Sequence, residues 1–390
     1  MSRRICGIAL VAVLAAAIPV RGQDWDRAIS LFNQKQYRSA IAQFHTVLRA
    51  NPDYWQAWYY IGYGHFQLKE YEDSTDSFDR YIKGAGGHDK EQAAGYYFVG
   101  FSRYEMKQYD RAVQAFSQYV SLMERLRQTV DPTALAAEGR SYIFSAHYAE
   151  AIPPLTRAAA EMKNNSNNYY YVGFAEQKLG HEDRAISALN QGLGIDPKDA
   201  DTLALLANIY LGRVRQDPGA ARLAVATGER LISVRNDDAS AALLGQAYLL
   251  DKQYSKAAPL LGQYARAHSD SGPALFNYGL ALSRSGQWKP AAQAIEQSLK
   301  LVPGNRAAML ELGYVYESDK QYDKALDIYQ RAYAASGNKD EIARGGIDRV
   351  KQIMASPSSG TALPSNTTNK STPPGTSVAP GTKPAKPPEL

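Results

Sequence analysis

Apolar residues recur along most of this chain at steps of three and four residues, which is the spacing of an amphipathic helix. The stretch WQAWYYIGYGHF, residues 55–66, stands out because its rings favour a β-strand on propensity alone. Twelve residues without a turn signal are long for a strand, however. On a helix they form two stripes about 100° apart, with Trp58, Ile61, Gly62 and His65 on one and Tyr59, Tyr63 and Phe66 on the other. We therefore predict a helix.

Two sets of small residues recur through the chain at spacings close to 34 residues. The first set is Ala28, Gly62, Gly100, Gly139, Gly173, Ala207, Gly245, Gly279 and Gly313. The second set follows the first by 12 residues in eight of nine cases and is Ala40, Ser74, Ala112, Ala151, Ala185, Ala224, Ala257, Ala291 and Ala325. Small residues let two helix backbones approach closely, because a larger side chain at the crossing would hold them apart.

Larger residues surround each member of the second set. Three residues earlier there is usually a ring, as in Tyr37, Tyr71, Tyr109, Tyr148, Tyr254, Trp288 and Tyr322. Four residues later there is usually a large apolar side chain, as in Phe44, Phe78, Phe116, Leu155, Leu189, Leu261, Ile295 and Tyr329. With the helical period of the apolar residues, this arrangement predicts two helices in each repeat and a ring that fills the turn between them.

The repeat resembles the tetratricopeptide repeat, a helix-turn-helix unit of 34 residues. The segments GHEDRAI, from Gly180, and GQWKPAA, from Gly286, match the turn between its helices and the start of its second helix. Pro52, Pro197 and Pro303 match its proline-marked exit. The resemblance covers residues 21–339, nearly all of the chain that remains once the N-terminal segment described below is set aside.

The resemblance implies an all-α fold, a right-handed superhelical solenoid of about nine helix-turn-helix repeats with a C-terminal capping helix. The expected repeats are approximately residues 23–54, 55–88, 93–126, 132–165, 166–199, 200–237, 238–271, 272–305 and 306–339. We expect the capping helix over residues 340–355. One apolar stripe marks it, formed by Ile342, Ile347, Val350, Ile353 and Met354, with Asp340 on another face.

The two ends of the chain differ from the repeats. A basic start, MSRR, a 16-residue apolar run and small residues at Val20 and Gly22 predict a signal peptide over residues 1–22 and export to the periplasm or out of the cell. The alternative is an uncleaved membrane anchor, but the run is shorter than the ~20 residues that span a bilayer. Residues 356–390 are rich in Pro, Ser and Thr, which predicts a disordered tail that acts as a tether or has no binding role.

The charge of the chain and its lack of catalytic motifs limit the classes of function that fit the sequence. The net charge of +5 comes from the two ends and leaves the repeats neutral, which argues against a nucleic-acid partner. The single cysteine, Cys6, would be lost with the signal peptide. The six histidines have no second ligand at helical or turn spacing, so we predict no metal site. Without a phosphate loop or a nucleophile elbow, we predict no catalytic residues, no enzyme activity and no cofactor.

Stacked helix pairs form a concave groove lined by the first helix of each repeat. The resemblance implies that ligands contact positions five, nine and twelve of a repeat, which share one helix face. The predicted ligand-binding residues, from repeats two, three and five, are Tyr59, Tyr63, Phe66, Tyr97, Phe101, Tyr104, Tyr170 and Phe174. Repeat four places Ala136, Arg140 and Ile143 there. Repeats six to nine place Ala204, Asn208, Leu211, Ala242, Gln246, Leu249, Phe276, Leu280, Ser283, Leu310, Tyr314 and Glu317 there.

Two interpretations of these rings stay open. They form a ligand surface, since tyrosine offers an apolar face and a hydroxyl group at low entropic cost, or they pack against the neighbouring repeat. We predict a ligand surface because the rings cluster in one half of the chain. One familiar ligand is excluded, because Tyr59 and Tyr63 replace the Lys and Asn with which cytosolic relatives clamp acidic chaperone C-termini.

The sequence therefore predicts a non-catalytic extracytoplasmic scaffold whose aromatic groove binds a protein or peptide partner. After cleavage of the signal peptide it would have no membrane span. The alternative is a polysaccharide-binding adaptor in the cell envelope or in exopolysaccharide export, which an aromatic groove without strong charge also suits. Both functions depend partly on analogy with the fold.

Overall fold

The computed structural model describes residues 22–355 of the chain. This part is all-α, with successive helices and no residue in a strand. It divides into two compact units, unit 1 up to Leu179 and unit 2 from Gly180. The predicted signal peptide, apart from Gly22, and the predicted tail lie outside the described residues.

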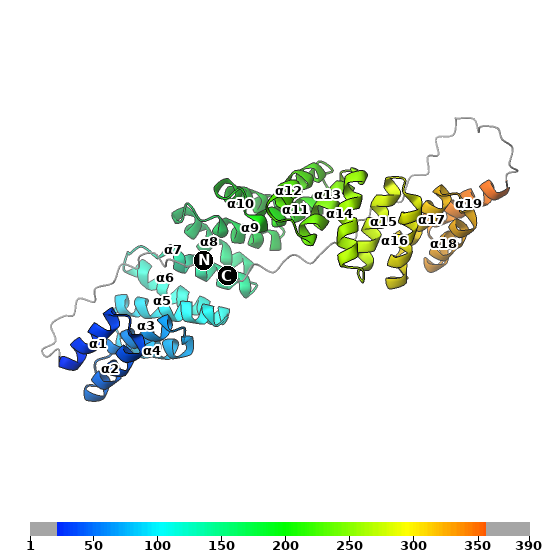
Figure 1. Ribbon diagram of the computed structural model, residues 1–390. Helices are drawn as coiled ribbons and strands as arrows, with labels where there is room; N and C mark the ends of the chain where they lie inside the picture. The colour runs from blue at the N-terminus through cyan, green and yellow to red at the C-terminus, as the bar shows by residue number, and fades with distance from the viewer. Residues whose placement is uncertain (1–21, 356–390) are drawn as a thin grey trace. The chain divides into compact units, whose positions relative to one another are not determined.

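The helices follow one another with short connections (Figure 1). Unit 1 contains α1 Gln23–Asn33, α2 Tyr37–Ala50, α3 Ala57–Gln67, α4 Tyr71–Gly84, α5 Asp89–Glu105, α6 Tyr109–Arg125, α7 Pro132–Phe144, α8 Tyr148–Glu161 and α9 Ser166–Lys178. Unit 2 contains α10 Glu182–Ile195, α11 Ala200–Arg213, α12 Ala220–Val234, α13 Asp238–Leu250, α14 Tyr254–Ala267, α15 Gly272–Arg284, α16 Trp288–Leu301, α17 Arg306–Ser318, α18 Tyr322–Ala335 and α19 Glu341–Ala355.

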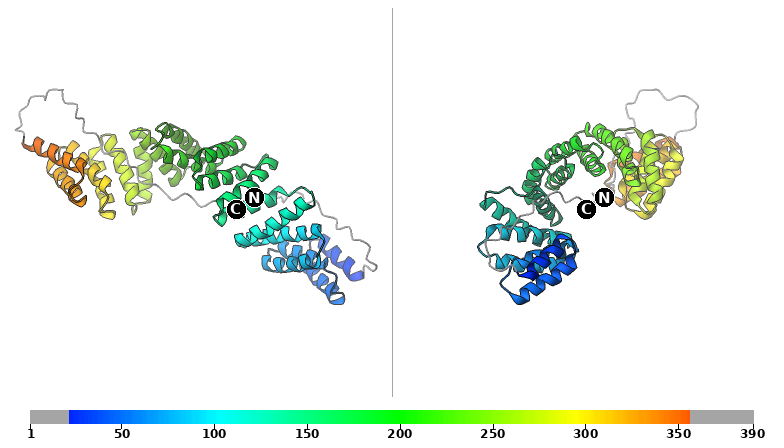
Figure 2. Two further views of the ribbon diagram at one scale, coloured as in Figure 1. Left: turned by 180° about the vertical axis from the view of Figure 1, so that it is seen from behind. Right: turned by 60° about the vertical axis from the view of Figure 1, so that its left-hand side comes forward.

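Within each unit, every helix packs against the next one along the chain, as the views in Figure 2 also show. In unit 1 the odd-numbered helices α3, α5, α7 and α9 also contact one another in sequence order. The odd-numbered helices therefore form a continuous inner row in this unit. This row carries the residues that the sequence assigns to positions five, nine and twelve.

Most hairpins close through the same turn. A residue in the left-handed region ends the first helix: Lys35, Lys69, Lys107, Ala146, Lys252 and Lys320 have φ of 58–62°, and Gly180 and Gly286 have φ of 79°. After α1, the N–H of Gln36 donates to the carbonyl of Leu31 and the N–H of Lys35 to that of Phe32. These bonds satisfy carbonyls that the helix end leaves free. The ring that sequence analysis placed at the turn then begins the second helix.

The recurring small residues lie where two helices cross. A Cβ atom added to Gly62 would come within 2.8 Å of the Phe78 ring, and one added to Gly100 within 2.6 Å of the Phe116 ring. Both rings are fully buried. The close approach inferred from sequence is therefore confirmed, and it joins the first and second helices of each repeat.

The expected capping helix is present as α19, but its apolar stripe is buried only in part, at Val350 and partly at Ile347. Helix α19 buries Ala343, Gly346 and Val350, whereas Ile342, Ile353 and Met354 are exposed. Helix α19 packs on α17 and α18, and Ala343, Gly346 and Val350 form the narrow strip that covers the end of unit 2. Asp340, expected on another face, is buried. It accepts hydrogen bonds from the N–H groups of Ile342 and Ala343 and caps α19.

Candidate functional site

The eight predicted ligand-binding residues lie on three odd-numbered helices of unit 1, of which α3 and α5 are neighbours and α9 is separated from α5 by α7. Helix α3 carries Tyr59, Tyr63 and Phe66, and α5 carries Tyr97, Phe101 and Tyr104. Helix α9 carries Tyr170 and Phe174. On α3 and α5 the three residues are four and then three positions apart, and on α9 the two residues are four positions apart. Each set therefore lies on one face of its helix.

Five of these residues belong to one network of ring contacts. Its centre is Phe98, a buried residue that the sequence analysis did not select. The Phe98 ring centroid lies 5.4 Å from that of Tyr63, 5.5 Å from that of Phe66 and 5.2 Å from that of Tyr97. Tyr59 joins through Phe98 and Phe101 through Tyr97. Most of these pairs are edge-to-face, the arrangement that aromatic rings prefer.

The other three residues belong to a second ring network. Tyr104 contacts Tyr109 and Phe144, and Phe144 contacts Tyr171. Tyr171 in turn contacts Tyr170, which stacks on Phe174. The structure therefore gathers the eight residues into two groups rather than one continuous row.

The eight side chains differ in how much surface they leave for a ligand. The six on α3 and α5 are partly exposed, whereas Tyr170 and Phe174 are only 5 % and 4 % exposed. Burial raises the pKa values of Tyr59, Tyr63 and Tyr97 above their ordinary value. These phenols are therefore neutral at physiological pH, and α3 and α5 offer most of the contact area.

Residues of the first repeat extend this surface, although sequence analysis did not select them. Phe32, on α1, is partly exposed, and its ring centroid lies 5.4 Å from that of Tyr63. Counting from the small residue Ala28, as was done for Gly62 in the second repeat, would have placed Phe32 at position twelve. We call Phe32, Tyr59, Tyr63, Phe66, Tyr97, Phe101 and Tyr104 the aromatic face.

The equivalent positions of unit 2 are mostly covered. Seven of the twelve are buried, namely Ala242, Gln246, Leu249, Phe276, Leu280, Ser283 and Leu310. The charges nearby are paired. The two terminal nitrogens of Arg284 donate to the Glu311 carboxylate at 2.7 and 2.9 Å, and Glu311 also accepts from Ser283 Oγ. The side chains of Arg284 and Glu311 are 7 % and 2 % exposed, so the pair is part of the core of unit 2.

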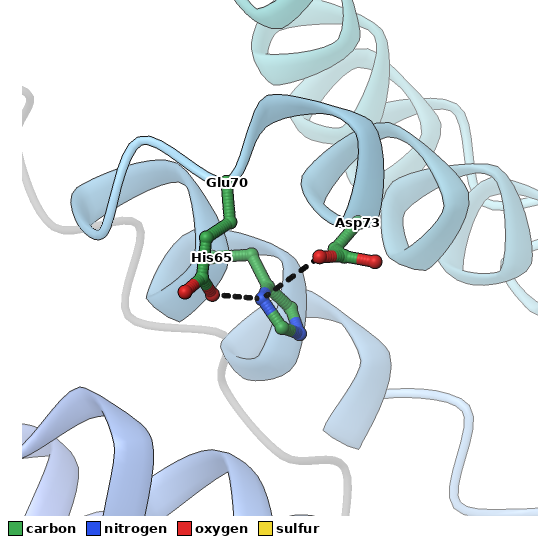
Figure 3. A group of neighbouring side chains, drawn as sticks. All are labelled: His65, Glu70 and Asp73. Atoms are coloured by element: carbon green, nitrogen blue, oxygen red, sulfur yellow. Dashed lines mark hydrogen bonds and ion pairs between the residues drawn. The ribbon is translucent and has the colours of Figure 1, made fainter.

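His65 has potential metal ligands beside it, contrary to the expectation that each histidine lacks a second ligand. Its Nδ1 lies 2.8 Å from Glu70 Oε2 and 4.0 Å from Asp73 Oδ2 (Figure 3). The three ligand atoms lie within 4.8 Å of one another, and this donor set suits zinc. Glu70 follows His65 by five residues, which is longer than the helical spacing of three or four residues. The turn between α3 and α4 brings the two side chains together.

The same contacts also explain the cluster without a metal. The His65 hydrogen bond lowers the pKa of Glu70, and the Arg38 guanidinium, 2.8 Å from the other carboxylate oxygen, lowers it further. The carboxylate is therefore ionised and already has two donors, and the positive charge of Arg38 opposes a bound cation. The cluster ties the turn between α3 and α4 to the neighbouring α2.

A trough of about 780 Å³ lies along α5 and α6. Arg103 and Arg111 line it, and both donate to the side-chain oxygen of Gln108. Ser117, also in its lining, donates to buried Glu138 at 2.7 Å. Burial raises the pKa of Glu138. A serine that donates to a carboxylate in this way satisfies a buried acid, and no imidazole lines the trough beside it to act as a base.

Between residues 22 and 355, no helix combines the length and the apolar character needed to cross a bilayer.

The paired helices, their shared turn and the glycines at their crossings define a helical-repeat protein. The tetratricopeptide repeat family matches the chain at residues 26–89, in unit 1, and at residues 276–340, in unit 2. The chain therefore contains tetratricopeptide repeats in both units, as the sequence pattern predicts. No curated protein matches the chain in sequence.

Solved structures of repeat proteins are similar to parts of the chain. YrrB, described as a TPR protein with an unusual peptide-binding site, is 18 % identical over 50 % of this chain and 97 % of its own, with a TM-score of 0.46. The C-terminal part of a TPR repeat-containing protein from Cytophaga hutchinsonii is 18 % identical over 64 % and 99 %, with a TM-score of 0.48. MamA from Desulfovibrio magneticus RS-1 is 18 % identical over 45 % and 97 %, with a TM-score of 0.40.

Proposed function

We propose that this chain is a non-catalytic scaffold whose aromatic face binds an extended segment of a partner protein. The observation that carries the proposal is the partial exposure of the rings on α3 and α5. In unit 2, by contrast, most of the equivalent positions are buried. Rings that are rigidly held and partly exposed give a large contact area at low entropic cost. An extended segment suits a row of side chains that runs across successive helices.

The ring contacts favour a protein segment over a polysaccharide. Sugars bind aromatic side chains by stacking on a free ring face. On the aromatic face many rings already use their faces for one another: Tyr59 contacts Tyr63 and Phe78, and Tyr63 also contacts Phe32 and Phe98. The parts of these rings that stay exposed suit the apolar side chains of a peptide.

The proposed site of action is outside the cytoplasm. The support is the sequence of residues 1–22, with its basic start, apolar run and small residues before the cleavage position. A scaffold in the periplasm or outside the cell would meet its partner there. N-terminal sequencing of the protein recovered from the cell envelope tests this point, and an intact Met1 in a cytosolic fraction would contradict it.

Affinity capture from the cell envelope tests the binding proposal. The mature chain is compared with a Tyr63→Ala/Phe101→Ala variant and with a control, Leu211→Ala/Tyr314→Ala, which changes partly exposed residues at equivalent positions of unit 2. We expect the first variant alone to lose its partner protein. Identical partners from all three proteins would overturn the proposal. Recovery that depends on added polysaccharide would instead favour the adaptor function.

A further inference from the structure

A positive charge lies at one end of the aromatic face. Arg140, on α7, takes in the fourth repeat the position that Tyr63 takes in the second. Its guanidinium carbon lies 5.5 Å from the centroid of the Tyr104 ring, much as the Tyr63 ring lies 5.4 Å from that of Phe32. Arg140 therefore continues the same line of contacts between neighbouring repeats, with a cation in place of a ring.

This guanidinium has no acidic partner within the described chain. Its Nε donates to the Ala136 carbonyl at 3.1 Å, which directs the side chain along the Tyr104 ring. No carboxylate of residues 22–355 forms an ion pair with it, whereas Arg157 and Arg125 of the same unit pair with Glu124 and Asp89. Arg140 is also partly buried, so it has given up some of its hydration.

Four N–H donors of Arg140, those on the two terminal nitrogens, are available to a ligand. A planar guanidinium with two free nitrogens binds a carboxylate through two parallel hydrogen bonds. The guanidinium lies over the Tyr104 ring, and the cation–π attraction stabilises its positive charge and limits the movement of the side chain. The chemistry at this end of the aromatic face thus suits an acidic group of the ligand.

We propose that Arg140 binds a side-chain carboxylate of the partner segment that occupies the aromatic face. The inference rests on the function proposed above and adds to it the charge and the register of the partner. Two steps along the inner row, at roughly 8–10 Å for each pair of packed helices, separate Tyr63 from Arg140. At about 3.3 Å per residue, an extended segment covers this distance in about six residues. The partner would therefore carry an apolar anchor and an Asp or Glu about six residues apart.

Two matched peptides of about ten residues test this inference, each labelled for fluorescence anisotropy. One has a Leu-Phe pair and a Glu about six residues away, and the other has Gln in place of Glu. The full chain is compared with R140Q, which keeps most of the side-chain volume, and with R157Q, which removes a paired arginine elsewhere in unit 1. We expect the Glu peptide to bind the unaltered chain about tenfold more tightly than the Gln peptide. R140Q should abolish this difference and R157Q should keep it.

The other outcomes separate this inference from the function on which it rests. Equal binding of the two peptides, weakened in both cases by Tyr63→Ala, would overturn the role of Arg140 and support the aromatic face. If neither peptide binds but an oligouronate binds in a way that depends on Arg140, the proposal of a protein partner would be overturned and a polysaccharide ligand would be favoured. Failure of both peptides and of the oligouronate would overturn the charge recognition and count against the aromatic face itself.

Discussion

The two units build the same repeat and use its inner positions differently. In unit 1, positions five, nine and twelve hold partly exposed rings on α3 and α5, and Arg140 on α7 forms no ion pair with any residue between 22 and 355. In unit 2, most of the same positions are buried, and Arg284 and Glu311 neutralise each other inside the core. The helix pairs, the turns and the crossing glycines are common to both units.

The difference shows how a repeat fold separates stability from recognition. The crossings that join the helices pair a small residue with a large buried side chain in both units, as at Gly139 with Leu155 and at Gly279 with Ile295. The inner positions differ between the units, although some of them contact the crossing residues, as Tyr59 contacts Phe78. In unit 2, neighbouring helices cover most of these positions, Phe276 included. In unit 1, the six rings on α3 and α5 stay partly exposed, whereas Tyr170 and Phe174 on α9 are buried.

The largest expected effect concerns the buried pair of unit 2. Arg284→Met leaves Glu311 buried without its cation, which costs about 3–5 kcal/mol when one member of such a pair is removed. Hydrogen exchange measured by mass spectrometry should show faster exchange in α15 and α17 and unchanged exchange in unit 1. The double variant Arg284→Met/Glu311→Leu should recover most of the protection. Unchanged exchange in the single variant would show that the pair is not a core interaction.

A smaller effect is expected at the crossings, and it should be equal in the two units. An added Cβ would lie 2.4 Å from Leu155 at Gly139 in unit 1 and 2.5 Å from Ile295 at Gly279 in unit 2. Each Gly→Ala variant should therefore lose about 1–2 kcal/mol in urea unfolding, since overpacking outweighs the gain in helix propensity. Gly194→Ala, which meets no atom within 4 Å, is the control and should not destabilise. A loss in one unit only would contradict the shared scaffold.

Binding measurements should distinguish the two units, with a loss of affinity about as large as that caused by removing one interface residue. Phe66→Ala removes a partly exposed ring of unit 1, and Leu211→Ala shortens a partly exposed residue of unit 2. We expect the first variant to weaken binding of the Glu peptide about tenfold and the second to leave it unchanged. Anisotropy titrations measure both. Equal losses would show that the partner contacts both units.

The smallest expected effect is a pH dependence confined to unit 1. Burial raises the pKa of Glu138 above its ordinary value of 4.5, so the folded state holds the proton more tightly than the unfolded state. The contribution of Glu138 to the free energy of unfolding is therefore largest below pH 4.5 and is lost as the pH rises through the folded-state pKa. Glu138→Gln keeps an acceptor for Ser117 and removes this loss. It should be more stable than the unaltered chain at pH 7, with no advantage near pH 4, in urea unfolding at the two pH values.

The fold could be predicted from sequence because the same pattern of small and large residues recurs in each repeat. Gly100 and Phe116 illustrate it, since a ring sixteen residues after a glycine fits only if the two helices cross there. The repetition also outweighed the strand propensity of residues 55–66, most of which lie in α3. The division at Gly180, inside the fifth predicted repeat, carries no comparable mark in the sequence.

The candidate site could be predicted only in part. The periodicity placed the rings on one helix face, but exposure depends on which neighbouring repeat covers each ring, and Tyr170 and Phe174 prove to be buried. Tyr104 and Arg140 belong to different repeats, which α6 and the connection to α7 separate in the chain, so spacing alone did not reveal their contact. The use of the rings in binding stays a prediction.

Site-specific photo-crosslinking tests the central claim most directly, which is that the inner positions of unit 1 bind a partner and those of unit 2 do not. A photoreactive phenylalanine analogue is placed at Phe66 in one protein and at Tyr314 in another, both partly exposed. After irradiation in cells, we expect a discrete cross-linked protein from Phe66 and none from Tyr314. The same product from both positions, or a product from Tyr314 alone, would contradict the account.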